Sequence, residues 1–125
     1  MGSIDANRPL SDAEYRLARW MLENGNAEAR NYLSQLEDAK VTPWRCKCGC
    51  ASIVFQIDGH PPAPPGVHVL GDYVCGSVDE PAGAFIYECG ELLAGIEVYG
   101  LAGEAPKELP TAPLRPFGEE PHPDR

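Results

Sequence analysis

The apolar side chains of this chain change their spacing part-way along it. Up to about residue 41 they recur every three or four positions, which is typical of an amphipathic helix. From Ile53 onward they alternate with other residues at every second position, which is typical of a strand. Because a helical stripe and a strand face must each be buried against another element, this order predicts an α+β fold, with helices packed on a mainly antiparallel sheet.

Two helices are predicted in the first third of the chain. Ser11 and Glu14 have the spacing of a capping box, so the first helix should begin after Ser11 and end near Gly25. The second should start after residue 26, run to about Lys40 and end before Pro43. The short link between the two predicted helices favours their packing as an antiparallel pair. The apolar stripe of the two helices is predicted to contain Leu17, Met21, Leu33 and Leu36.

About four strands are predicted in the remainder. One covers residues 53–57, one covers 67–75 with an interruption or bulge at Gly71, and a hairpin covers 84–99. The hairpin turn is placed at Cys89 and Gly90, so we expect Cys89 to be exposed. The strand face that should meet the helices consists of Ile53, Phe55, Ile57, Leu92, Ala94, Ile96 and Val98.

Composition divides the chain into one α+β domain at residues 1–105 and an extended tail at 106–125. The tail holds six prolines in twenty residues, which disfavours regular structure. Leu109, Leu114 and Phe117 are the tail residues expected to contact the domain.

The charge of the chain excludes some partners. The net charge is −9, and residues 42–103 carry −5 with only Arg45 and Lys47 as cations. Without a basic patch to neutralise phosphates, direct binding to nucleic acid is not expected, and a basic protein is the fitting partner. No apolar run is long enough to span a bilayer, and no signal peptide is recognised, so a cytoplasmic protein is expected.

The densest chemistry lies at Cys46, Cys48 and Cys50, three thiols in five residues. Zinc is usually held by four Cys or His ligands, and Gly49 permits a turn that would bring sulfurs together. Cys75 is the predicted fourth ligand, with His60 and His68 as the other candidates. The spacing of these residues matches no known zinc module, and the second cysteine pair that such modules usually contain is missing from the sequence.

Two other interpretations of the cysteines stay open. Arg45 and Lys47 would favour a thiolate at Cys46 or Cys48, which suits a thiol-redox protein. The third interpretation is that the cysteines are small packing residues in a tight connection. Asp58, Asp72, Asp79 and Glu80 form a candidate acidic surface, whereas Glu88, Glu91 and Glu97 are interpreted as a solvated strand face and turn.

Several segments together resemble a family of small bacterial proteins for which no activity is established. They are LSDAE at 10–14, WMLENG at 20–25, LSQL at 33–36, RCKCGCAS at 45–52, GIEVY at 95–99 and the proline-rich stretch 109–116. The resemblance covers most of the chain, and RCxCGCxS is its most specific part. It implies a fold but no catalytic residues.

The sequence therefore predicts a small acidic cytoplasmic protein that acts as a non-enzymatic protein-binding module. Immunity proteins, which neutralise a toxin, are similar in size and charge. The motifs of nucleotide-binding, hydrolase and metalloprotease sites are missing from the sequence, so no catalytic residues and no cofactor are expected. The alternatives are a zinc protein with Cys46, Cys48, Cys50 and Cys75 as ligands, and a thiol-redox protein.

Overall fold

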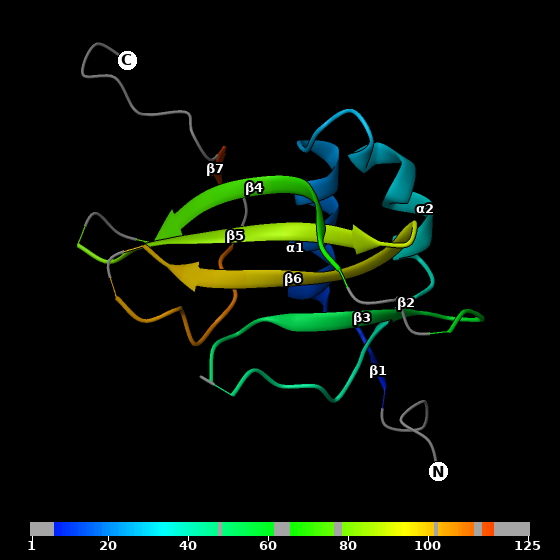
Figure 1. The fold of residues 1–125 in the computed structure, drawn as a ribbon, viewed down its shortest axis with the longest axis horizontal. Helices are drawn as coiled ribbons and strands as arrows, with labels where there is room; N and C mark the ends of the chain where they lie inside the picture. The colour runs from blue at the N-terminus through cyan, green and yellow to red at the C-terminus, as the bar shows by residue number, and fades with distance from the viewer. Residues whose placement is uncertain are drawn as a thin grey trace.

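The computed structural model describes residues 7–47, 49–61, 66–76, 79–101, 103–111 and 114–116. Two short helices follow the first strand, and most of the remaining chain is sheet (Figure 1). The elements are β1 (Arg8–Pro9), α1 (Asp12–Glu23), the 3-10 helix η2 (Ala29–Tyr32), α2 (Leu33–Leu36), β2 (Ala39–Val41), β3 (Ile53–Ile57), β4 (His68–Gly76), β5 (Pro81–Cys89), β6 (Leu92–Gly100) and β7 (Arg115–Pro116). The α+β class predicted from the sequence is confirmed.

All strand pairs in the sheet are antiparallel. The described strands form one seven-stranded sheet in the order β1-β2-β3-β6-β5-β4-β7. The strands predicted from the sequence correspond to β3, β4, β5 and β6. The predicted number of about four was too low, because β1, β2 and β7 have only two or three residues each. Such short segments are too brief to show a period in the sequence.

Helix α1 begins where the sequence predicts. The Glu14 amide donates to Ser11 Oγ at 3.1 Å, and the Ser11 amide donates to Glu14 Oε1 at 2.8 Å, which completes the capping box. Arg8, on β1, donates two further hydrogen bonds to the Glu14 carboxylate and so ties the strand to the helix. Leu17 and Met21 are buried on the helix face that meets the sheet.

The second helix is shorter than predicted. The helical segment ends at Leu36, and Lys40 lies on β2, opposite Gln56 of β3. Ala39 and Val41 are buried while Lys40 is exposed, which is the alternation of a strand. The prediction that the helix continues to Lys40 was wrong, because pairing with β3 satisfies the backbone groups of residues 39–41 in extended form.

The β5–β6 turn lies one residue later than predicted. Gly90 and Glu91 both have positive φ, +58° and +68°, as the two central residues of a type I′ turn require. Cys89 instead pairs with Leu92 and is only 6% exposed. The prediction of an exposed Cys89 at the turn was therefore wrong.

Two bulges set which side chains face the helices. The β5–β6 register shifts at Ala94, so that Leu93 becomes fully buried in the core cluster and Leu92 only partly buried beside it. The predicted alternation in this part of β6 was thus displaced by one residue. In β4 the register shifts between Val69 and Gly71, which confirms the predicted interruption.

The core lies between the helices and one face of the sheet. In Figure 1, α1 passes behind the strands. The Tyr73 hydroxyl donates to the Met21 carbonyl at 2.5 Å, and the Trp20 and Tyr73 rings lie 5.1 Å apart. The remaining core positions include Leu17, Leu22, Leu36, Phe55, Ile57, Ala84, Ile86, Leu93, Ile96 and Val98. Within the described residues, the helices are too short and too polar to cross a bilayer.

Part of the predicted tail contacts the domain. Leu109 and Leu114 pack against the core, and β7 pairs with Tyr73 and Val74 of β4. The Ala51 amide donates to the Pro106 carbonyl at 3.0 Å. Phe117, the third residue expected to contact the domain, lies outside the described residues.

Candidate binding surface

The sheet face opposite the helices carries aromatic and acidic side chains in register. Asp72 on β4, Phe85 on β5 and Glu97 on β6 are direct partners and form one row across three strands. Because directly paired residues share a face, their neighbours two positions away lie on this face too. We call it the open face; its other members are Val54, Gln56, Val69, Val74, Gly83, Tyr87, Gly95 and Tyr99, with Lys40 and Arg115 at its two edges.

Three aromatic rings form a continuous group on the open face. Phe85 lies 5.7 Å from Tyr87 and 6.0 Å from Tyr99, measured between ring centroids, with tilted planes. These separations are in the range of favourable aromatic pairs. All three side chains are half-buried, whereas Ala84 and Ile86, which alternate with them on β5 and point to the helices, are fully buried.

Each of the two tyrosines faces a glycine on the neighbouring strand, which leaves room for its ring. Gly83 is paired with Tyr99 and Gly95 with Tyr87. A Cβ atom at Gly83 would lie 2.2 Å from Tyr99 Cζ, and one at Gly95 would lie 2.5 Å from the Ile53 carbonyl oxygen. The rings therefore lie against bare backbone, and the face is flatter than alternating side chains would make it.

Two polar groups of the open face are hydrogen-bonded to each other. The Tyr99 hydroxyl donates to Asp72 Oδ1 at 3.0 Å. Burial, together with the nearby Glu97, raises the pKa of Tyr87 to about 12. Burial and the Asp72 hydrogen bond also raise the pKa of Tyr99 above its ordinary value. Both phenols are thus protonated at neutral pH and can donate hydrogen bonds.

The four longer strands carry charge of only one sign, whereas Lys40 on β2 and Arg115 on β7 lie at the two edges of this face, opposite Gln56 and Val74. Between Lys47 and Lys107 the sequence contains no lysine or arginine, and this interval includes β3, β4, β5 and β6. The open face itself carries the carboxylates of Asp72 and Glu97. A cationic group approaching the face therefore meets no like charge from these strands.

A histidine lies between two carboxylates at one end of β4. His68 Nδ1 is hydrogen-bonded to Glu88, its register partner on β5, and His68 Nε2 lies 3.6 Å from Glu28 Oε1. The hydrogen bond to Glu88 is the largest cause that raises the pKa of His68. The Glu88 side chain is buried and also accepts from the Glu91 amide at 2.8 Å. Residues of this group surround an open hollow of about 530 Å³.

This arrangement was not predicted from the sequence. His68 was considered there as a candidate zinc ligand and Glu88 as part of a solvated face, and the 7% exposure of Glu88 corrects the second interpretation. His68 and Glu88 are 20 residues apart in the sequence, and no sequence motif links residues at this separation. Only the β4–β5 register brings the two side chains together.

The structure describes two members of the cysteine cluster. Cys46 and Cys50 are half-buried in the connection before β3, and Cys48 lies outside the described residues. The Gly49 amide donates to the Cys46 carbonyl at 3.0 Å, and Gly49 has a φ of +83°, so the predicted turn at this glycine is present. Cys50 Sγ lies 3.3 Å from Ser52 Oγ.

The other candidate ligands are distributed over the sheet. Cys75 is buried in the core on β4, and β6 and β5 separate β4 from β3. His60 follows the opposite end of β3 from the cluster, and His68 pairs with Glu88. Among the described residues, no group of three or more His, Cys, Asp or Glu side chains is arranged to hold a metal ion. The zinc site with Cys46, Cys48, Cys50 and Cys75 stays a prediction.

The four acidic residues singled out in the sequence do not form one rim. Asp72 lies on the open face, while Asp79 and Glu80 lie between β4 and β5. Asp58 follows β3 at the other end of the sheet. Of this set, Asp72 is the member that lies in register with the aromatic group.

Comparison with known proteins adds no assignment. No family model, no curated protein and no solved structure matches the chain. The function therefore has to be argued from the residues themselves.

Proposed function

We propose that this protein is a non-enzymatic binding module that recognises a cationic segment of another protein on its open face. The observation that carries the proposal is the row Asp72–Phe85–Glu97, in which an aromatic ring lies between two carboxylates on neighbouring strands. An arginine or lysine side chain can place its charge over such a ring and still reach a carboxylate.

Cation–π attraction and the burial of aromatic rings both favour a basic partner. A cation over an aromatic face contributes about 0.5–2 kcal/mol, depending on how far it is desolvated. Tyrosine is among the residues that contribute most to protein interfaces, because a large rigid ring is buried at little entropic cost. Tyr87 and Tyr99 supply such rings beside Phe85.

The whole-chain charge acts in the same direction. A net charge of −9 on 125 residues steers a basic partner toward the protein and accelerates association at low salt. An immunity-like role, in which a small acidic protein covers a basic partner, is one form of this proposal. Its motivation is size and charge together with the aromatic and acidic open face.

Selection from a random-peptide display library tests the proposal without knowledge of the partner. The purified protein should enrich peptides that contain arginine or lysine. The double variant Asp72→Asn, Glu97→Gln should lose this enrichment, and Phe85→Leu should weaken it while keeping an apolar side chain of similar size.

The matched control is the double variant Asp12→Asn, Glu108→Gln. It changes the net charge by the same amount, but both residues are exposed outside the open face. Enrichment should survive in the control. If the two double variants lose enrichment equally, general charge attraction is responsible. If basic peptides are not enriched by the unmodified protein, the proposal fails.

A further inference from the structure

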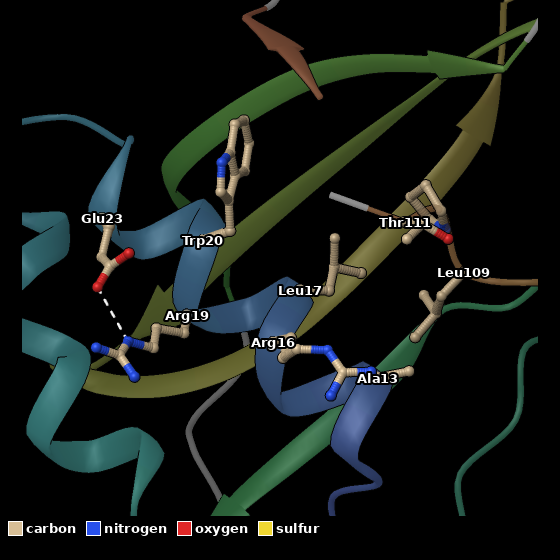
Figure 2. Close-up of a pocket in the computed structure, with 9 residues that line it drawn as sticks. Ala13, Arg16, Leu17, Arg19, Trp20, Glu23, Leu109 and Thr111 are labelled. Carbon is tan, nitrogen blue, oxygen red and sulfur yellow. Dashed lines mark hydrogen bonds and ion pairs between the residues drawn. The ribbon is translucent and has the colours of Figure 1, made fainter. Parts of the chain in front are cut away.

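A groove runs between α1 and the tail segment that follows Pro106. Its volume is about 360 Å³, and Leu17, Trp20 and Leu109 form much of its apolar lining. In Figure 2, Leu17 projects from the helix toward Leu109 and Thr111 on the opposite wall. The volume is at the small end of the range for small-molecule sites, and the lining is predominantly apolar, as in such sites.

Both walls of the groove are fixed by contacts outside it. Trp20 packs against Tyr73, whose hydroxyl is bonded to the helix backbone at Met21. The tail wall is attached on its N-terminal side by the hydrogen bond between Ala51 and Pro106. On its C-terminal side, β7 pairs with β4. A ligand would therefore enter a groove that is already formed, at low cost in ordering.

The groove is also where cationic side chains meet apolar surface in this acidic chain. Arg16 and Arg19 both line it. The Arg19 guanidinium is engaged with Glu23, with Nε 3.0 Å from Oε2. Arg16 makes no ion pair within the part of the chain that the structure describes. One guanidinium, with several donors in a planar fork, is therefore available at the edge of an apolar groove.

We propose that this groove binds a small apolar carboxylate of the medium-chain fatty acid type. The carboxylate would pair with Arg16, and the chain would lie against Leu17, Trp20 and Leu109. At roughly 30 Å³ per small group, the volume accommodates roughly a dozen non-hydrogen atoms, which is the size of decanoate. The groove lies on the helix side of the sheet, so this inference is independent of the proposed protein-binding face.

Tryptophan fluorescence tests the proposal directly. The chain has two tryptophans, and Trp44 is 49% exposed outside the groove, so Trp44→Phe leaves Trp20 as the only reporter. Titration with decanoate below its micelle concentration should give a saturable change in Trp20 emission with one site per chain. Decanol and decyltrimethylammonium, which share the chain but lack the anionic group, should bind more weakly.

Variants separate the contribution of the Arg16 charge to binding from the contribution of the apolar groove. Arg16→Gln should weaken decanoate binding about tenfold, the effect of losing one charge-assisted hydrogen bond, and should leave decanol binding unchanged. Arg30→Gln is the matched control, because Arg30 is exposed on η2 outside the groove. Ala13→Leu, at an exposed helix position that lines the groove, should block both ligands without loss of helical circular dichroism.

Three results would overturn the inference. One is the absence of a saturable change, as expected if a segment of the chain itself fills the groove. Another is an equal effect of Arg16→Gln and Arg30→Gln on decanoate binding. The third is binding of decanol or decyltrimethylammonium as tight as that of decanoate, which would indicate a nonspecific apolar surface.

Discussion

At the scale of single residues, His68 is the titratable side chain with the clearest electrostatic environment. It contacts the Glu88 carboxylate at one ring nitrogen and approaches Glu28 at the other. Its own side chain is 56% exposed, so solvent screens both contacts. The contact between His68 and Glu88 therefore contributes modestly to the free energy of unfolding. The change of this contribution with pH identifies the contact better than its magnitude does.

The raised pKa of His68 predicts a definite pH dependence. A group whose pKa is higher in the folded state contributes its full stabilisation below its unfolded pKa and loses it as the pH rises through the folded value. The free energy of unfolding should thus exceed that of His68→Gln most at about pH 5.5 and least at about pH 8.5, on either side of the usual histidine value. Urea unfolding at both pH values measures this difference.

The control for this prediction is His60→Gln. His60 is exposed after β3 and makes no ion pair among the described residues. Comparison with this variant separates the loss of the carboxylate contacts of His68 from the loss of a histidine side chain. A difference for His68→Gln that does not change with pH would contradict the role assigned to the pair.

At the scale of elements, the β5–β6 turn contains the only described non-glycine residue with positive φ. Glu91 occupies a position where Asn, Asp or Gly is preferred, and the left-handed conformation costs an ordinary residue about 1–2 kcal/mol. Its backbone groups are used by Gln35 and Glu88, but these contacts do not involve the Glu91 side chain.

Glu91→Asn should therefore stabilise the protein by about 1 kcal/mol, because asparagine tolerates this conformation better. The midpoint and slope of urea denaturation give the change in free energy of unfolding. Glu108→Asn, at an exposed position in the tail, makes the same chemical change without a positive φ and should have little effect. Equal stabilisation by both variants would mean that relief of negative charge is responsible.

Elements whose signals are local were predicted well. Ser11 and Glu14 are three residues apart and together define the start of α1, so the sequence alone was sufficient. The second helix was predicted to run to about Lys40 because Lys40 continues its spacing of three to four residues and suits the negative end of a helix. The strand conformation of Ala39–Val41 depends on pairing with β3, some fifteen residues later in the chain.

At the scale of the whole molecule, the fold separates two kinds of surface. The open face combines carboxylates with aromatic rings, whereas the helix side holds a groove edged by arginines. The cysteine cluster precedes β3 and belongs to neither surface. The zinc hypothesis can therefore be tested separately from both binding proposals.

The zinc alternative predicts one zinc ion per chain in freshly purified protein, measured by elemental analysis. Thiols of the cluster should resist a thiol reagent until a chelator removes the metal. Cys46→Ser should lose the metal. Cys89→Ser should retain it, because Cys89 is buried at the far end of β5. Metal-free protein with freely titrating thiols would contradict the zinc alternative.

The sequence by itself determined the α+β class, the start of α1, the position of the four longer strands and the acidic charge. These features follow from the spacing of neighbouring residues and from composition, which act over one or two turns of chain. Tertiary structure decided which side chains meet. The row Asp72–Phe85–Glu97, the pair His68–Glu88 and the groove between Trp20 and Leu109 each join residues from distant segments. Strand register and packing bring them together, and a local pattern carries no information about either.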